Sequence, residues 1–581
     1  MTSWVSSPSV FEELFLGRVR HDLLTPFPAQ DSADRLTGDA QMERLAVLLR
    51  ERIDPEAVEL SGRLPGGAVE ALRDAGFLAM TLDPAIGGLG LSQVNAFRLV
   101  HLAASWCTAA AFALGVGNGF GSGSYLAVLP PGPLKDMISA RVAAGLVSGG
   151  ADAEPGGTAN RARATTAVPV EGGYLISGQK VFIGNAPVAD LMDVSATLAG
   201  TSRVRLFFVD TRSPGFVVSA RHEFMGLRGA AIGAVRLDDV LVPEWALMPE
   251  EGDGWRMRPD APAAEGPDLA GLAVGARHLV IAPVALALAR SCLRWSREFV
   301  SRRAVDGRGL GSYDEIQRVL AESAADVYAI ESVATWGLLG GAGAPELTAA
   351  KNLVSRACWR VADRTVSLMG GEGYETSRSK RRRGAVAAPV ERAFRDARAL
   401  RVAGGVDFML DAWSAQPALV RCYAGADPAA DAGAGGVGGV GVGIGGAGVG
   451  VGVVEEQARM LAAACAHLVK AHPREELFER QRTVRLLGRI AGELLGMAVV
   501  QARSASTSTN PPAVPAASHD AGPAASHGAD AAASHGGDPI AGLAVTGARH
   551  RLAGLWARLA EDEPSRASIR FDHLITDLME N

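Results

Sequence analysis

The sequence lacks an excess of positive charge and has few cysteines. Its 581 residues carry a net charge of -6 at neutral pH. Nucleic acids and anionic membranes are bound through a basic surface, so neither is expected as the main partner. The five cysteines are scattered without CxxC spacing. They indicate neither a disulfide framework nor a structural zinc site, and they favour a reducing, cytoplasmic location.

Long apolar runs are also scarce. The first residues lack the basic flank and continuous apolar core of a signal peptide. Only residues 432–454 are long and uncharged enough to suggest a membrane span, and about half of them are glycine. Glycine costs ~1 kcal/mol per helical position relative to alanine, so we interpret the run as a flexible linker and expect no membrane span. Its GxGxxG pattern follows no predicted strand and is interpreted as an accident of composition.

What the sequence does contain is an ordered series of segments. A chain of this length exceeds a single core, and three or four structural units are expected. After an N-terminal extension over 1–41, helical periodicity covers 42–146 and includes one buried helix over 94–117. Short β-branched runs over 147–250 are typical of a small antiparallel sheet or barrel. Helical periodicity then returns over 266–423, at lengths that suit an antiparallel bundle.

The remaining chain alternates between low-complexity and helical segments. Residues 424–453 are the glycine-rich linker, and 454–581 form an additional helical domain. An insert within it, 503–539, repeats Ala-Ser-His. Metal binding is one interpretation of this tract, but a disordered linker is favoured and no metal site is predicted. The predicted fold class is α+β: an N-terminal helical domain, a central antiparallel β domain, a C-terminal four-helix bundle and an extra C-terminal helical domain.

Six short stretches occur in a distinctive order over some 240 residues. They read "AEPGGTANRARATT", "GYLISGQKVFIGNAPVADL", "VDTRSPGF", "GLRGAAIGAVRLDDVLVP", "MGGEGYE" and "VERAFRDAR". Together they resemble the acyl-CoA dehydrogenase family, and the chain after residue 454 is similar to longer bacterial members with an added helical domain. The resemblance implies FAD bound between the β domain and the bundle, and a homodimer or homotetramer. It also implies an acyl thioester substrate, on CoA or a carrier protein, and a flavoprotein or oxygen as electron acceptor.

Such a reaction removes a very weakly acidic α-hydrogen. The protein must therefore polarise the thioester carbonyl and hold a base at the α-carbon. The cofactor supplies the redox step, and the protein supplies the geometry and the base.

Carried over position by position, the resemblance implies a set of cofactor-binding residues. They are Glu154, Thr158, Phe182, Ile183, Gly184, Arg303, Gln317, Gly370, Gly371 and Gly405. Glu154 and Thr158 lie in the loop that contacts flavin and thioester, and Phe182 lies beside the flavin ring. Arg303 occupies the place of the family's arginine that reaches the FAD pyrophosphate of a neighbouring subunit, a task that suits the guanidinium fork. For Phe182 a core aromatic, and for the loop a plain turn, are the competing interpretations.

Several positions depart from the family pattern, and each departure loses a cofactor contact. They are Ala153 for threonine, Gly184 for threonine, Asp306 for phenylalanine and Ser367 for glutamine. The resemblance still implies substrate contacts from Thr158, Tyr374 and Gly404. A basic run follows, formed by Arg378, Lys380, Arg381, Arg382 and Arg383. It could meet CoA phosphates or an acidic carrier protein, although a solvated loop is the commoner explanation.

The family's catalytic carboxylate is missing from both places where it occurs. One place follows the RDAR segment and is Gly404 here; the other lies on the first bundle helix and is Arg277. The backbone N–H of Gly404 can still polarise a carbonyl. Asp407, three residues on, is the candidate substitute base, and an acid that stabilises a helix N-terminus is the competing interpretation.

Three functions remain open at this point. The first is a FAD-dependent oxidoreductase that dehydrogenates an acyl thioester at its α and β carbons, with activity altered or lost at Gly404. The second is a flavin-dependent monooxygenase on the same fold, which needs no such carboxylate. The third is a catalytically silent relative that has kept a binding or assembly role.

Overall fold

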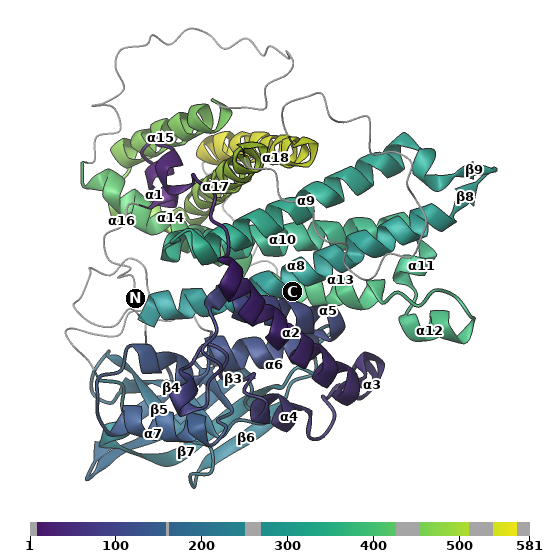
Figure 1. The fold of residues 1–581 in the computed structure, drawn as a ribbon. Helices are drawn as coiled ribbons and strands as arrows, with labels where there is room; N and C mark the ends of the chain where they lie inside the picture. The colour runs from purple at the N-terminus through teal and green to yellow at the C-terminus, as the bar shows by residue number, and fades with distance from the viewer. Residues whose placement is uncertain (1–8, 158–161, 250–268, 426–451, 510–537, 566–581) are drawn as a thin grey trace, which may run out of the picture. The chain divides into compact units, whose positions relative to one another are not determined.

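The chain divides into two units that are described separately. The first contains Gln30–Leu310 and Val354–Val406, and the second contains Ser7–Ala29, Gly311–Leu353 and Asp407 onward. The computed structural model describes residues 9–157, 162–249, 269–425, 452–509 and 538–565 (Figure 1). Thr158, most of the glycine-rich linker and the Ala-Ser-His repeats lie outside the described residues.

The first unit begins with a series of helices. Their bounds are α2 Ser32–Arg52, α3 Pro55–Ser61, α4 Ala68–Asp74, η2 Pro84–Ile86, α5 Gln93–Trp106, α6 Thr108–Gly119, η3 Ser122–Ala127 and α7 Pro133–Ala143. Helix α2 begins ten residues before the predicted start at 42, because Asp31 caps it by accepting from the N–H groups of Ala33 and Asp34. The prediction of one buried helix over 94–117 is wrong. Cys107 is extended, with φ -150°, and it separates α5 from α6.

A seven-stranded sheet follows. Its strands are β1 Ser148–Ala151, β2 Thr166–Val170, β3 Gly173–Gly184, β4 Leu191–Leu198, β5 Val204–Asp210, β6 Phe216–Arg221 and β7 Ile232–Pro243, with the short helix η4 Glu244–Ala246 after them. Their order is β1-β4-β2-β3-β7-β6, with β5 on β4. Most pairings are antiparallel as predicted, but β4 pairs in parallel with both β1 and β2. The sheet is therefore mixed at β4.

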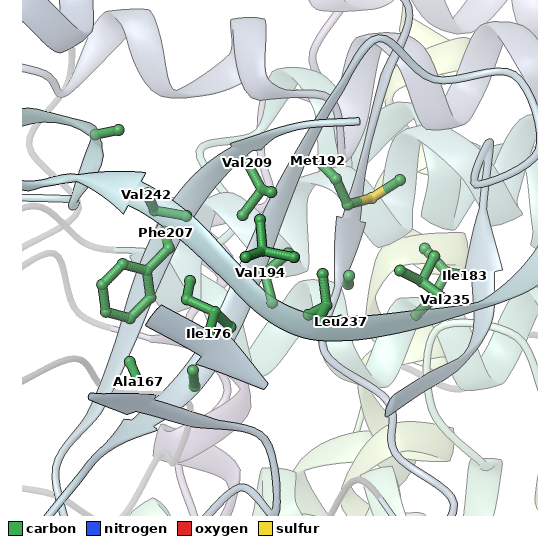
Figure 2. Packing of buried hydrophobic residues seen from close by; sticks show 14 of the residues in the cluster. Ala167, Ile176, Ile183, Met192, Val194, Phe207, Val209, Val235, Leu237 and Val242 are labelled. Atoms are coloured by element: carbon green, nitrogen blue, oxygen red, sulfur yellow. The ribbon is translucent and has the colours of Figure 1, made fainter. Parts of the chain in front are cut away.

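The β domain has its own core (Figure 2). Ile176 of β3, Val194 of β4, Phe207 of β5 and Leu237 of β7 are at most 1% exposed and belong to one cluster. Each such buried side chain contributes ~1.5–3 kcal/mol relative to an exposed one. This core fixes β3 and β7, which carry the candidate flavin-side residues.

The first unit ends with further helices, some long and some short. They are α8 Leu269–Arg302, the second half of α10 Ala344–Met369, and the short helices α11 Gly371–Tyr374, α12 Ser377–Arg382 and α13 Val390–Leu400. Helix α8 packs against α5 and α6. One stretch of it, Gly271–Arg302, is long and apolar enough to cross a membrane, which the sequence reading overlooked. However, 78% of its most apolar window is buried, as in the core helix of a soluble protein.

The second unit is helical. Its elements are α1 Val10–Leu14, η1 His21–Leu23, η5 Leu310–Ser312 at its boundary, α9 Asp314–Leu339, the first half of α10, α14 Asp407–Tyr423, α15 Val453–Ala471, α16 Arg474–Glu479, α17 Gln481–Thr509 and α18 Pro539–Ser565. Helix α17 contacts α9, α14, α15 and α18 (Figure 1). A β-carbon on Gly488 would lie 1.9 Å from the carbonyl oxygen of Asp411, so α14 and α17 approach closely because of this glycine. Helix α17 also continues into the predicted insert, which begins at 503.

Candidate active site

The two sequence positions of the missing base face each other. Gly404 lies in the turn after α13 with φ +69°, and Arg277 lies on α8. A β-carbon built on Gly404 would lie 3.1 Å from Cγ of Arg277 and 3.6 Å from its Cδ. The alternative positions of the family's carboxylate therefore converge in space, and the residues found there are a glycine and a cation.

The turn that carries Gly404 is fixed through α13. Asp396 is buried and accepts a hydrogen bond from the N–H of Leu227 at 2.6 Å. Arg395 donates to the carbonyl oxygen of Met225 and to the Glu59 carboxylate. The RDAR segment thus ties α13 to the loop before β7 and to α3.

The N–H of Gly404 is available to a ligand. Ala403 donates to the carbonyl oxygen of Ala399 at 2.8 Å, and Gly405 donates to that of Val402 at 3.2 Å. Among the described residues, no acceptor takes a hydrogen bond from the N–H of Gly404 itself. An exposed donor between two satisfied ones is suited to binding a carbonyl oxygen.

Arg277 is part-buried and carries an unpaired charge. Over the part of the chain that the structure describes, its guanidinium makes no hydrogen bond and no ion pair within 4 Å. Burial lowers the pKa of Arg277, and the negative charge of Asp152 acts in the opposite direction. The Asp152 carboxylate is already bound by Arg163 at 2.8 and 3.1 Å and accepts from Ser195 at 2.6 Å.

Phe182 is an exposed aromatic on a strained backbone. Its φ is +60°, an uncommon conformation for a bulky residue, and its side chain is 63% exposed. The pairing of β3 with β7 is irregular between Lys180 and Ile183, which permits this conformation. The Phe182 ring lies 4.9 Å from that of His222 and 6.3 Å from that of Phe224. Strain that exposes an apolar ring is typical of a functional site.

The two residues after Phe182 are placed differently. Ile183 is 2% exposed and belongs to the β core, so only its backbone can meet a ligand. At Gly184 a β-carbon would lie 3.2 Å from Val116 of α6. The threonine expected there would be crowded by Val116. The glycine at this position therefore fits the close approach of α6.

Glu154 is held inside the β domain. Its carboxylate is buried and accepts from Lys180 Nζ at 2.8 Å and from the N–H groups of Ala164 and Thr165. Burial alone would raise the pKa of Glu154, but the hydrogen bonds from Lys180 and Thr165 outweigh it and lower the pKa. The structure thus assigns Glu154 contacts that hold the loop, and a direct contact with a cofactor stays a prediction.

The arginine and glycine motifs meet at Glu372. Arg302 and Arg303 lie 2.8 and 3.5 Å from its carboxylate oxygens, and both guanidiniums lie over the Phe299 ring. Glu372 follows Gly371. A β-carbon on Gly370 or Gly371 would meet no atom within 4 Å, so the backbone there borders open space. The neighbouring Tyr374 is 82% exposed.

The phenylalanine expected after Arg303 has been replaced by a hairpin turn. Asp306 and Gly307 both have positive φ and join β8 Ala304–Val305 to β9 Arg308–Gly309. Asp-Gly is the residue pair that such a two-residue turn favours. The local sequence therefore specifies a turn at Asp306 rather than an aromatic contact.

The basic run is not a uniformly solvated loop. Lys380 is fully buried, and its Nζ donates to the carbonyl oxygens of Glu372 and Ala388. Arg383 pairs with Glu375 at 2.6 Å. These contacts stabilise the α12 region, and the buried Lys380 is not available to CoA phosphates.

Two candidate residues belong to the second unit. Gln317 lies on α9, where its side-chain amide donates to the carbonyl oxygen of Gly311. Asp407 is the first residue of α14 and is 6% exposed, a position that favours a carboxylate. Its backbone oxygen accepts from Asn352 Nδ2 at 2.7 Å. Its role as a base stays a prediction.

His222, Phe224 and Glu372 also belong to this region, although the sequence motifs do not indicate them. His222 Nε2 lies 3.2 Å from the N–H of Phe182, and the two side chains with Phe224 form one aromatic group. The sequence signal that could have indicated them is the spacing of His222 and Phe224, two aromatic residues at positions i and i+2 of an extended segment, which places them on the same side. Glu372 stood inside a recognised motif, but nothing in the motif indicates its partners.

Comparison with known proteins decides the family. Residues 39–129, 151–240 and 266–411 match the N-terminal, middle and C-terminal domains of acyl-CoA dehydrogenase. Cyclohexane-1-carbonyl-CoA dehydrogenase of Geobacter metallireducens is 30% identical over 380 residues, which cover 63% of this chain and 93% of that protein. This chain belongs to the acyl-CoA dehydrogenase family.

Longer relatives resemble more of the chain. The probable acyl-CoA dehydrogenase FadE10 of Mycobacterium tuberculosis is 30% identical over 410 residues, which are 68% of this chain and 61% of that protein. The match thus spans less than two thirds of that relative. A solved acyl-CoA dehydrogenase of Bacillus anthracis, described as complexed with FAD, aligns with 98% of this chain and 94% of its own. Its TM-score of 0.71 at 18% identity confirms the predicted α+β fold, including the C-terminal helices.

Proposed function

We propose that this acyl-CoA dehydrogenase family member is a FAD-dependent oxidoreductase that acts on an acyl thioester. The observation that carries the proposal is the unpaired N–H of Gly404, in the position where the family polarises the thioester carbonyl. The turn that presents this N–H is fixed by the buried Asp396. A donor held in place by the fold needs no reorganisation when the substrate binds.

The described residues fit a flavin dinucleotide. Phe182 offers an exposed ring for the flavin face, Gly370 and Gly371 border open space, and Arg303 with Arg302 offers guanidiniums for phosphate. FAD would supply the two-electron oxidation. Glu372 already neutralises part of the charge on the two arginines, so a pyrophosphate would compete with it.

The chain's own residues would bind and orient the thioester. The N–H of Gly404 donates to the thioester oxygen, and Arg277 lines the site beside it. Neither position removes the α-proton. Loss of a positioned base costs ~10²- to 10⁴-fold in rate, so Asp407 is the proposed substitute and slow dehydrogenation is expected.

The proposed partners follow from the family. The substrate is an acyl-CoA or an acyl-carrier-protein thioester, and the electron acceptor is a flavoprotein or oxygen. We place the protein in the cytoplasm as a homodimer or homotetramer, since the family's arginine at the Arg303 position serves a neighbouring subunit.

A second candidate is a flavin-dependent monooxygenase on the same fold. It is favoured by the meeting of Gly404 and Arg277, which leaves both positions of the base without a carboxylate. The third candidate, a catalytically silent relative with a binding or assembly role, is favoured by the turn that replaces a cofactor contact at Asp306.

Absorbance of the purified protein separates these functions. The proposal predicts a yellow protein that an acyl-CoA bleaches slowly without oxygen, and bleaching that is lost in Asp407→Asn. The control is Asp411→Asn, one helical turn further along α14. A yellow protein reduced only by an external NAD(P)H system, with oxygen consumption, would establish the monooxygenase. A colourless protein that takes up no FAD would exclude both enzymes.

A further inference from the structure

We infer that Arg277, beside Gly404, binds a carboxylate on the acyl chain, so that the preferred substrate is the thioester of a dicarboxylic acid. The inference rests on the proposed function, because it assumes that an acyl thioester enters this site. It adds the chemical class of the acyl group and assigns a substrate-binding role to Arg277.

Arg277 limits the space beside Gly404. A β-carbon on Gly404 would lie 3.1 Å from Cγ of Arg277, so the aliphatic stem of the arginine lies against the glycine backbone. The φ of +69° further restricts this position to glycine. A carboxylate side chain is thereby disfavoured by both contact and conformation, and the guanidinium is the charged group that remains at this point.

The charge on Arg277 is unbalanced within the described ranges, where its side chain makes no hydrogen bond or ion pair. The negative charge that acts on the pKa of Arg277 is that of Asp152, and the carboxylate of Asp152 is already bound by Arg163 and Ser195. The site thus presents an excess cation at the position where the resemblance implies an anion. An incoming anion, not a neutral acyl chain, complements it.

Binding of an acyl thioester would bury Arg277 further, because its side chain is only part-buried in the free protein. A guanidinium that loses water without gaining an acceptor is destabilised, whereas a carboxylate offers two oxygens that match its fork. A neutral chain therefore leaves an unpaired cation in the complex, and the site discriminates against it by about tenfold or more.

Calorimetric titration of the FAD-loaded protein tests the inference without measuring turnover. The probes are malonyl-, succinyl- and glutaryl-CoA, each compared with the neutral thioester of equal carbon number: propionyl-, butyryl- and valeryl-CoA. At least one dicarboxylic thioester is expected to bind about tenfold more tightly than its neutral counterpart. Arg277→Gln should abolish the difference, and Arg277→Lys should retain part of it.

The control is Arg294→Gln on the same helix, where Arg294 makes an exposed ion pair with Glu298. It should leave both affinities unchanged. Equal binding of both classes, or an equal loss of both in Arg277→Gln, would overturn the inference. If FAD is bound and butyryl-CoA still bleaches the flavin in that case, the proposed function survives. If no thioester binds and no FAD is taken up, both fall together.

Discussion

Gly404 lies against the side chain of Arg277, and a β-carbon on the glycine would come within 3.1 Å of the arginine's Cγ. Each residue therefore limits what can replace the other. The catalytic carboxylate of the family cannot be restored at Gly404 without a change at Arg277.

Gly404→Glu alone is expected to leave slow dehydrogenation unchanged. The new carboxylate would pair with Arg277, which lowers its basicity, and the left-handed backbone would cost ~1–2 kcal/mol. Combining Gly404→Glu with Arg277→Leu frees the carboxylate. Anaerobic flavin reduction by butyryl-CoA should then be ~10²-fold faster than in the single variant. A single variant as fast as the double would contradict this account.

Phe182→Gly is expected to stabilise the protein and weaken the binding of FAD. Glycine tolerates φ +60°, so relief of strain should increase the free energy of unfolding of the FAD-free protein by about 1 kcal/mol. The lost ring should raise the dissociation constant of FAD, measured by fluorescence titration.

Asp239→Gly is the matched control for Phe182. Asp239 also has positive φ, at +51°, but its carboxylate accepts from Ser177 and it lies on β7. FAD affinity should not change there. Equal losses of affinity in both variants would show that Phe182 does not act through its ring.

Asp193→Asn should remove a pH dependence of stability. Asp193 on β4 is buried, and it accepts from Tyr125 at 3.1 Å and from Ser122 at 3.3 Å. Burial raises its pKa from 3.8 to about 7. The folded state then holds its proton more tightly than the unfolded state, so this carboxyl destabilises the protein progressively from pH 4 to 7 and fully above pH 7.

The asparagine variant should therefore have a higher Tm than the parent protein at pH 8, and the gain in Tm should be clearly smaller at pH 5. One pKa unit corresponds to about 1.4 kcal/mol, so the gain at pH 8 is of the order of 1–4 kcal/mol. Tyr125→Phe, which removes one donor, should lower the Tm at pH 8. A gain of equal size at both pH values would contradict the assignment.

Lys180→Met should destabilise the β domain by ~3–5 kcal/mol, because Glu154 would remain buried without its cation. The double variant Lys180→Met with Glu154→Gln should lose less, since it buries no unpaired charge and the amide oxygen can still accept from either Ala164 or Thr165. Urea unfolding measures the coupling. If Glu154 acts only by holding its loop, the double variant keeps its FAD affinity, and selective loss of FAD would instead indicate direct contact.

The sequence located the two positions of the base but not their contact. Gly404 and Arg277 were each found by comparison with family motifs, and their adjacency depends on how α13 is fixed by Asp396. Phe182 was likewise found from its motif. Its positive φ was not, because that conformation arises from the irregular pairing of β3 with β7. Tertiary pairing, absent from local patterns, decided both.

Local patterns failed for similar reasons elsewhere. The composition around Lys380 indicated a solvated basic loop, yet two backbone oxygens bind its ammonium group in the interior. The apolar stretch around Cys107 has helical composition on both sides, and the break depends on one extended residue. Burial and chain direction at single positions do not follow from composition.

The close approach of α14 and α17 at Gly488 bears on how shorter versions of this protein would behave. Truncation at residue 423, shortly after the last residue matched by the family domains, strips α17 from α9 and α14 and exposes side chains such as Leu410 and Leu419. Such a truncated chain should aggregate on expression. The C-terminal helices therefore cannot be exchanged between relatives as an independent module, and recombination that preserves folding must carry α14 with them.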